Sequence, residues 1–214
     1  MSLTVYPIEY LILKSDITGD LEGRVEVPYF FGSKSEPTTL LLNAYISKDV
    51  ENFLSEWYDN SLNLPLLEED IKPIIEAVIE SQVGYLSSSF VSFYMDYFSF
   101  QTYQAHPMTV RKTYNYDLCR NKFVSIYDIL GDNTKESRKI IIDTINSEIK
   151  SNSEFYFNTK IDTLDYYQDY YIFEDNLVIV FQLYEIAPYV SGIREFSFPL
   201  DKLGIQLSNE GVKH

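Results

Sequence analysis

Apolar and β-branched residues dominate two segments near the N-terminus, residues 3–14 and 22–31, which lie on either side of a Gly19-Asp20 turn signal. Their apolar positions include Val5, Ile8, Leu11 and Leu13 in the first segment and Val25, Val27 and Tyr29 in the second. We expect these segments to open the fold as a pair of antiparallel strands.

The spacing of apolar residues then changes to three and four, the period of one face of an α-helix. Over residues 41–59 the apolar positions are Leu42, Ile46, Val50, Phe53, Leu54 and Trp57. Over residues 67–82 they are Ile71, Ile74, Ile75, Val78 and Ile79. Pro73 would fall in the first turn of the second segment, where its missing N–H costs little. The pattern therefore predicts two consecutive amphipathic helices.

Strand-like sequence returns over residues 84–118, with a break at Ala105-His106-Pro107, and again near the C-terminus. The C-terminal strands are predicted at residues 168–175, 177–184 and 194–200, the first two joined through Glu174-Asp175-Asn176.

A third helix is predicted between these two strand regions, after a short helical turn at residues 127–130. Asn133 can cap it, and Glu136 can reach back to the N–H of the cap, which would form a capping box. Its apolar face consists of Ile141, Ile142, Ile145 and Ile149.

The predicted order β-β-α-α-β-β-α-β-β-β lacks regular β-α-β alternation. It favours an α+β fold with antiparallel sheet and about three amphipathic helices. At about 150 residues per domain, 214 residues correspond to one large domain or two small packed ones. We expect an N-terminal half of residues 1–85 and a C-terminal half of residues 86–214 that together form one compact unit.

Composition limits the classes of partner. The 17 Lys and Arg against 32 Asp and Glu give a formal net charge of −15, which disfavours nucleic acid because a polyanion is repelled. Uninterrupted apolar runs are far shorter than the ~20 residues that cross a bilayer, so we predict no membrane span within these residues. The 19 tyrosines suit half-buried strands and binding surfaces alike.

Residues for catalysis or metal binding are scarce. The chain has one cysteine, Cys119, and two histidines, His106 and His214, with no His-x-x-x-His pair. The glycine spacing gives neither a GxGxxG fingerprint nor a P-loop, and no Gly-x-Ser-x-Gly elbow is present. We therefore predict no catalytic residue, metal or cofactor. A pair of carboxylates acting as in a glycosidase stays open as an alternative, because acidic residues are plentiful.

The segment Tyr184–Gly192, YEIAPYVSG, follows an apolar strand and differs from the rest of the chain. It fits a well-packed crossover loop, in which Pro188 fixes φ and Gly192 allows a turn. It also fits a rigid apolar knob formed by Pro188 and Tyr189 and presented to a partner, with tyrosine as a typical hot-spot residue. The two interpretations are compatible.

A resemblance to a known family rests on this segment and the strands around it. YYIFEDNLVIVFQLYEIAPYVSGIREFSFPLDKL resembles the C-terminal half of the extracytoplasmic domain shared by the lysozyme-sensing anti-sigma factor RsiV and the peptidoglycan deacetylase PdaC. SFVSFYMDYFSFQTYQAHPMTVRKTYNYDL is similar to the preceding part of the same family. A Gly-Gly-Ala-His-Gly-like turn of that family reads Tyr103-Gln104-Ala105-His106-Pro107 here, and the following strand ends Tyr114-Asn115-Tyr116-Asp117.

The resemblance implies an α+β binding domain outside the cytoplasmic membrane, its signal or anchor absent from these residues. A cytosolic start at Met1-Ser2-Leu3 is the alternative. In the sensing member this domain binds lysozyme and blocks its cleft, and in the deacetylase the chemistry belongs to a separate metal-dependent domain. By analogy, the partner-binding residues would be Tyr184, Glu185, Ala187, Pro188, Tyr189, Ser191 and Gly192, with Tyr103 and His106 bordering the same surface.

The sequence therefore predicts a non-catalytic extracytoplasmic binding module for a lysozyme-like muramidase or cell-wall glycan. The charge of −15 suits a basic partner. Two alternatives stay open: a cell-wall glycan hydrolase that uses two carboxylates, and a purely structural envelope domain.

Overall fold

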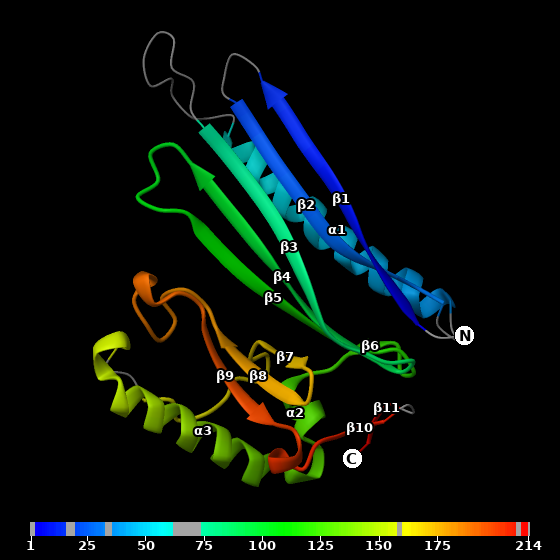
Figure 1. Ribbon diagram of the computed structural model, residues 1–214, viewed down its shortest axis with the longest axis vertical. Helices are drawn as coiled ribbons and strands as arrows, with labels where there is room; N and C mark the ends of the chain where they lie inside the picture. The colour runs from blue at the N-terminus through cyan, green and yellow to red at the C-terminus, as the bar shows by residue number, and fades with distance from the viewer. Residues whose placement is uncertain are drawn as a thin grey trace.

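The computed structural model describes residues 3–15, 20–32, 36–61, 74–157, 160–208 and 211–213. Its main element is a six-stranded sheet (Figure 1). The strands lie in the order β1 (Thr4–Ser15), β2 (Asp20–Phe31), β3 (Ile74–Leu86), β4 (Phe90–Gln101), β5 (Met108–Asp117) and β6 (Lys122–Phe123). The predicted opening pair of antiparallel strands is confirmed, with Tyr6 opposite Tyr29 and Ile8 opposite Val27. Gly19 of the predicted turn lies outside the described residues.

One pair in this sheet is parallel. Helix α1 (Glu36–Ser61) carries the chain back along the sheet, so β3 runs in the same direction as β2. The other neighbours in the sheet are antiparallel. The helix predicted at residues 41–59 is confirmed and is longer than its apolar pattern. The fold is thus α+β with mainly antiparallel sheets, and its one parallel pair was not predicted.

The helix predicted at residues 67–82 is wrong where the structure describes it. Residues from 74 onward form β3, in which Ile75, Ala77 and Ile79 are buried on one face. This period of two is that of a strand, and the short run of β-branched residues fits both periods. The beginning of the predicted helix, including Ile71 and Pro73, lies outside the described residues.

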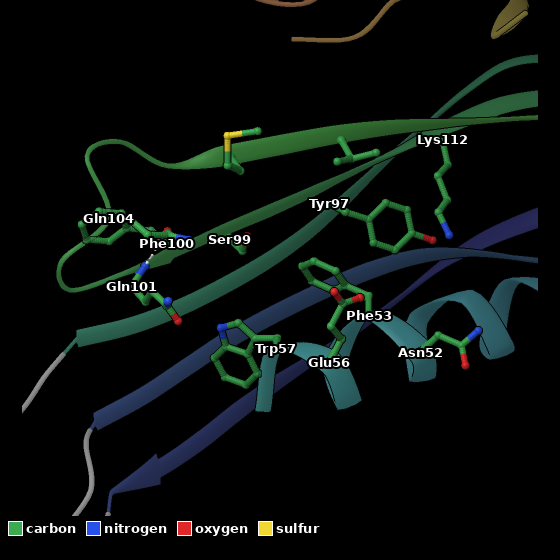
Figure 2. A pocket seen from close by; sticks show the side chains of 12 residues that line it. Asn52, Phe53, Glu56, Trp57, Tyr97, Ser99, Phe100, Gln101, Gln104 and Lys112 are labelled. Carbon is green, nitrogen blue, oxygen red and sulfur yellow. Dashed lines mark hydrogen bonds between the residues drawn. The ribbon is translucent and has the colours of Figure 1, made fainter. Parts of the chain in front are cut away.

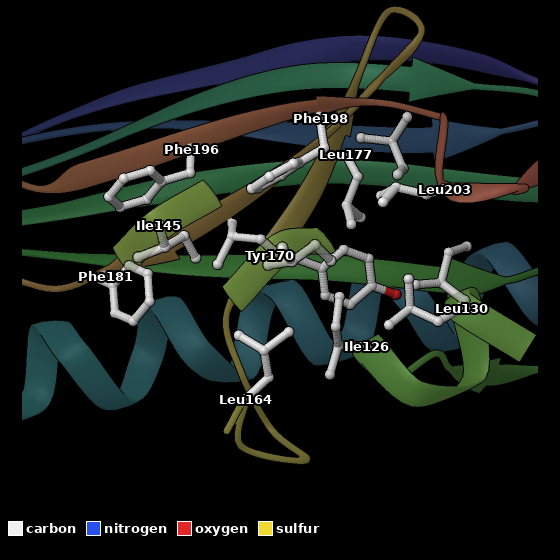
Figure 3. Close-up of a cluster of buried hydrophobic side chains, with 14 of the residues drawn as sticks. Ile126, Leu130, Ile145, Leu164, Tyr170, Leu177, Phe181, Phe196, Phe198 and Leu203 are labelled. Atoms are coloured by element: carbon white, nitrogen blue, oxygen red, sulfur yellow. The ribbon is translucent and has the colours of Figure 1, made fainter. Parts of the chain in front are cut away.

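A second, three-stranded antiparallel sheet consists of β7 (Tyr170–Phe173), β8 (Asn176–Phe181) and β9 (Arg194–Pro199), which confirms the three predicted C-terminal strands. Helices α2 (Ile126–Leu130) and α3 (Thr134–Ser151) enclose a hydrophobic core with it, centred on the fully buried ring of Tyr170 (Figure 3). A short pair, β10 (Gln206–Ser208) and β11 (Gly211–Lys213), follows β9.

The prediction of about three amphipathic helices is therefore wrong in number. Among the described residues only α1 and α3 have several turns, and α2 is a single turn. The predicted capping box at Asn133 and Glu136 does not form. Asn133 ends a 3₁₀ turn with φ −82° and ψ 9°, and its side chain makes no capping hydrogen bond. A capping side chain works from an extended backbone, and Ser125 before α2 has that conformation and forms the box with Asp128.

The two sheets pack together through alternate residues of β4. Val91, Phe93 and Met95 face α1 and belong to the first core. The intervening Ser92 and Tyr94 contact the small sheet, where the Ile172 N–H donates to Ser92 Oγ at 2.6 Å. A strand with period two therefore serves two cores, one on each face. No helix among the described residues is both long enough and apolar enough to cross a membrane.

Candidate functional site

Two loops that are far apart in the sequence are in contact through their side chains. One is the turn between β4 and β5, and the other is the connection from β8 to β9. The His106 ring stacks on the Tyr189 ring, with centroids 3.8 Å apart and planes 24° apart. The Tyr184 hydroxyl lies 2.7 Å from His106 Nε2, and the Tyr184 and Tyr189 rings lie 5.8 Å apart. The structure thus brings together three residues of the predicted partner surface.

The hydrogen bonds of His106 determine which atom donates in its contact with Tyr184. Its Nδ1 lies 3.0 Å from the carbonyl oxygen of Pro107, which can only accept, so Nδ1 carries the hydrogen. In a neutral ring Nε2 is then the acceptor, and the Tyr184 hydroxyl donates to it. The imidazole is held from both sides and gives a fixed platform to the Tyr189 ring.

The backbone at this site includes unusual conformations. Tyr184 and Tyr103 have φ values of 66° and 77°, in the left-handed region that non-glycine residues rarely occupy. Such residues persist when surrounding contacts determine them, and they cluster at functional sites. For Tyr184 the contacts are the hydrogen bond and ring contact with His106.

The most prominent side chain was not predicted. Val190 is 91% exposed, in the middle of the one-turn 3₁₀ helix Tyr189–Ser191. The predicted knob residues Pro188 and Tyr189 are only half-buried and serve as its base. Pro188 precedes the turn with φ −61°, and Gly192 ends it with φ 71°. We name the exposed part of this surface, Val190 with Tyr184, the Val190 protrusion.

The other predicted residues have structural contacts. Ser191 Oγ donates to the carbonyl of Phe155 at 3.0 Å, which ties the turn to the chain after α3. Ala187 is 2% exposed and packs in the second core, so its side chain is not on the surface. Glu185 accepts from the Gln182 N–H at 2.7 Å. Loss of hydration raises the pKa of Glu185, although that hydrogen bond opposes the rise.

The described residues include no group of three His, Cys, Asp or Glu side chains that could hold a metal ion. Cys119 is exposed in the turn between β5 and β6. What the loops do present is an apolar and aromatic protrusion on a fixed base, a form suited to a partner's concave surface.

Comparison with protein families gives one match. Residues 127–201 match the model of a family described as a protein of unknown function, DUF3298. The matched segment begins in α2 and includes α3, the three-stranded sheet and the segment Tyr184–Gly192. A search of curated proteins found no match.

Two solved structures have a similar fold over nearly the whole chain. A DUF3298 family protein from Pseudomonas aeruginosa is 16% identical with a TM-score of 0.66, covering 99% of this chain and 94% of its own. A DUF3298 family member from Bacteroides fragilis is 14% identical with a TM-score of 0.63, at the same coverage of 99% and 94%. At these identities the likeness concerns the fold.

Proposed function

We propose that this chain is a non-catalytic recognition module that binds a basic protein partner through the Val190 protrusion. The observation that carries the proposal is a valine 91% exposed on a one-turn helix whose neighbour Tyr189 is stacked on His106. An exposed apolar side chain on a fixed base loses little conformational entropy when it enters a partner's pocket. Tyrosine rings beside it are the side chains that most often dominate binding energy.

The basic character of the partner follows from charge. The chain carries −15, and Glu185 lies exposed beside Tyr184. Such a field accelerates encounter with a cationic protein and is weakened by salt. We take a lysozyme-like muramidase as the partner class, met outside the cytoplasmic membrane, because of the resemblance that segment Tyr184–Gly192 carries.

The test is calorimetric titration with a c-type lysozyme at low and high salt. We expect saturable binding that weakens with salt but persists, because apolar contact at Val190 is not screened. Binding that vanishes at high salt would show that only attraction between opposite charges holds the partner, and would contradict the apolar contact at Val190. Absence of binding at both salt concentrations would overturn the lysozyme-like partner and direct the search to cell-wall glycan.

Matched variants locate the contact. Val190→Ser should weaken binding by at least about 1 kcal/mol, and Tyr189→Ala by more, since it removes the base as well. Tyr167→Ala is the control, because Tyr167 is highly exposed but lies outside both loops. Equal losses in Val190→Ser and Tyr167→Ala would refute the placement of the interface.

A further inference from the structure

A groove lies between α1 and the strands β4 and β5, on the α1 side of the six-stranded sheet (Figure 2). Its volume is about 330 Å³, within the ~300–1,000 Å³ typical of small-molecule sites. Aromatic rings line much of it, from Phe53 and Trp57 on α1 and Tyr97 on β4. The turn between β4 and β5 reaches both places, with Gln104 at the groove and His106 beneath the Val190 protrusion, but no residue that lines the groove belongs to the protrusion.

A buried hydrogen-bond donor in the groove has no acceptor. Trp57 is 8% exposed, and its indole Nε1–H has no hydrogen-bond partner among the residues that the structure describes. In Figure 2 this nitrogen is on the side of the ring that faces the strands. Buried polar groups are nearly always paired, so an unpaired one needs an explanation. A ligand that supplies an acceptor would provide it.

The cationic group of the groove is already engaged. Lys112 Nζ lies 3.3 Å from Asp49 and over the ring of Tyr97. The Tyr97 hydroxyl lies 2.9 Å from that of Tyr114, which in turn donates to Asp49 at 2.8 Å. Tyr97 therefore presents its ring rather than its hydroxyl to the groove, and Asp49 balances the charge of Lys112.

The remaining polar groups are an acceptor and amide groups. Glu56 lines the groove from α1 and is exposed to solvent. Gln104 uses its Oε1 to accept from the Gln101 N–H at 3.0 Å, which leaves its amide NH₂ as a donor. The groove thus combines ring faces with a carboxylate acceptor and several neutral donors, among them the indole of Trp57 and the amides of Gln104, Gln101 and Asn52.

We propose that this groove binds a neutral sugar ring. A pyranose has apolar C–H faces for the aromatic rings and hydroxyl groups that donate to Glu56 and accept from Trp57 and Gln104. A purely apolar ligand would leave the indole N–H unpaired. An anionic ligand would meet Glu56 and a chain of net charge −15. These groups favour a neutral sugar over both.

The test uses the fact that Trp57 is the one tryptophan in the chain. Its emission, excited where tyrosine absorbs little, reports directly on the groove. We expect a saturable change in emission on titration with cellotriose or with the trimer of N-acetylglucosamine. Failure of both trimers and of their monosaccharides to produce a saturable change would overturn the proposal, as would tighter binding of a uronic acid or of an apolar dye.

Variants separate ring stacking from hydrogen bonding. Trp57→Phe keeps a ring and removes the donor, and calorimetry should show roughly three- to tenfold weaker binding of the same trimer. Glu56→Gln should weaken binding to a similar degree. If Trp57→Phe does not fold, Gln104→Ala tests the site instead, since Gln104 lies in a surface turn. Unchanged affinity in Glu56→Gln and Gln104→Ala would overturn the assignment.

The control is Val190→Ser, which leaves the groove intact and should bind the trimer as the unmodified chain does. Loss of lysozyme binding in Val190→Ser and loss of sugar binding in Glu56→Gln are therefore independent results. Either site can fail without affecting the conclusion about the other.

Discussion

Gly84 lies where the two sheets approach each other closely. A Cβ built there would lie 2.2 Å from the carbonyl oxygen of Ile172, and the Glu174 N–H donates to the Gly84 carbonyl at 3.3 Å. The register between β3 and β4 shifts at this point, between Val83 and Tyr85. A missing side chain thus allows β3 to contact the edge of β7.

We expect Gly84→Ala to destabilise the fold by roughly 1–3 kcal/mol, the range for overpacking, in urea unfolding followed by circular dichroism. Gly192→Ala separates backbone strain from overpacking. Gly192 has open space around its Cβ but φ 71° and ψ −171°, a region nearly restricted to glycine, so its cost of about 1–3 kcal/mol comes from the backbone alone. A Gly84→Ala variant as stable as the unmodified chain would contradict the close approach.

At the candidate site, the sequence indicated the residues but not their contacts. Tyr184 and His106 are separated by 78 positions, and nothing local to either predicts that their side chains meet. Val190 was missed because an apolar residue beside a tyrosine in a loop is typical of packing. Its exposure follows from how the turn is anchored at Ser191 and Tyr189, which is a tertiary property.

Among the elements, α2 is short and depends on its cap. Ser125 Oγ accepts from the Asp128 N–H at 3.1 Å, and the Ser125 N–H donates to the Asp128 carboxylate at 3.0 Å. Partial burial favours the neutral acid, but the hydrogen bonds from Ser125 and the nearby Lys122 outweigh it and lower the pKa of Asp128. The ionised carboxylate of Asp128 therefore stabilises the first turn of α2.

We expect Ser125→Ala to lower the free energy of unfolding by about 1 kcal/mol near neutral pH. A lowered folded pKa gives stability that is present above the unfolded pKa of about 3.9 and is lost as pH falls through the folded value. The difference between Ser125→Ala and the unmodified chain should therefore shrink below about pH 4. Urea unfolding at several pH values measures it, and a difference independent of pH would exclude the ionised cap.

The same elements show where sequence patterns succeed. Long segments with one clear period, such as α1 and α3, were predicted because their burial follows that period, and β8 was predicted as a short, wholly apolar run. The helix prediction failed at residues 74–82 because a run of isoleucine and valine fits the period of a helix and that of a strand. Pairing with β2 and β4 makes this segment a strand. Ser125 and Asp128 have the spacing of a capping box, so that signal was present in the sequence.

For the whole molecule, Arg111 joins the two sheets. Its guanidinium forms a two-point contact with Asp96 on β4, reaches Glu195 on β9 and stacks on Tyr94. The side chain is 13% exposed, so the charges are mostly removed from water. Gln182 adds bonds of 3.0 Å and 2.7 Å to the Arg111 backbone.

We expect Arg111→Met to destabilise the protein by about 3 kcal/mol, because it leaves two carboxylates in a partly buried seam without their partner. Arg24→Met is the matched control. Its ion pair with Glu80 is 58% exposed on the arginine side and should contribute at most about 1 kcal/mol. Similar losses in the two variants, measured by thermal unfolding, would contradict a role for Arg111 in joining the sheets.

The sequence pattern does not predict how the two sheets and the helices are layered. β4 reads as a near-continuous apolar and aromatic strand, which fits burial on both faces but does not say what covers each one. The crossover by α1, which makes β2 and β3 parallel, depended on identifying a single helix there instead of two.

Within the described part of the chain, strand β1 pairs only with β2 and so forms one edge of the six-stranded sheet. Its exposed side chains include Tyr6, Ile8, Tyr10 and Leu11, and its outer backbone groups pair with no strand that the structure describes. An edge of this kind is a template for strands of other copies, and natural proteins protect such edges with charge. Here the net charge of −15 keeps copies apart, and it disappears as the pH approaches the isoelectric point near 4.4. We therefore expect this edge to set the acid limit for handling the protein, with light scattering rising as the pH falls towards 4.4.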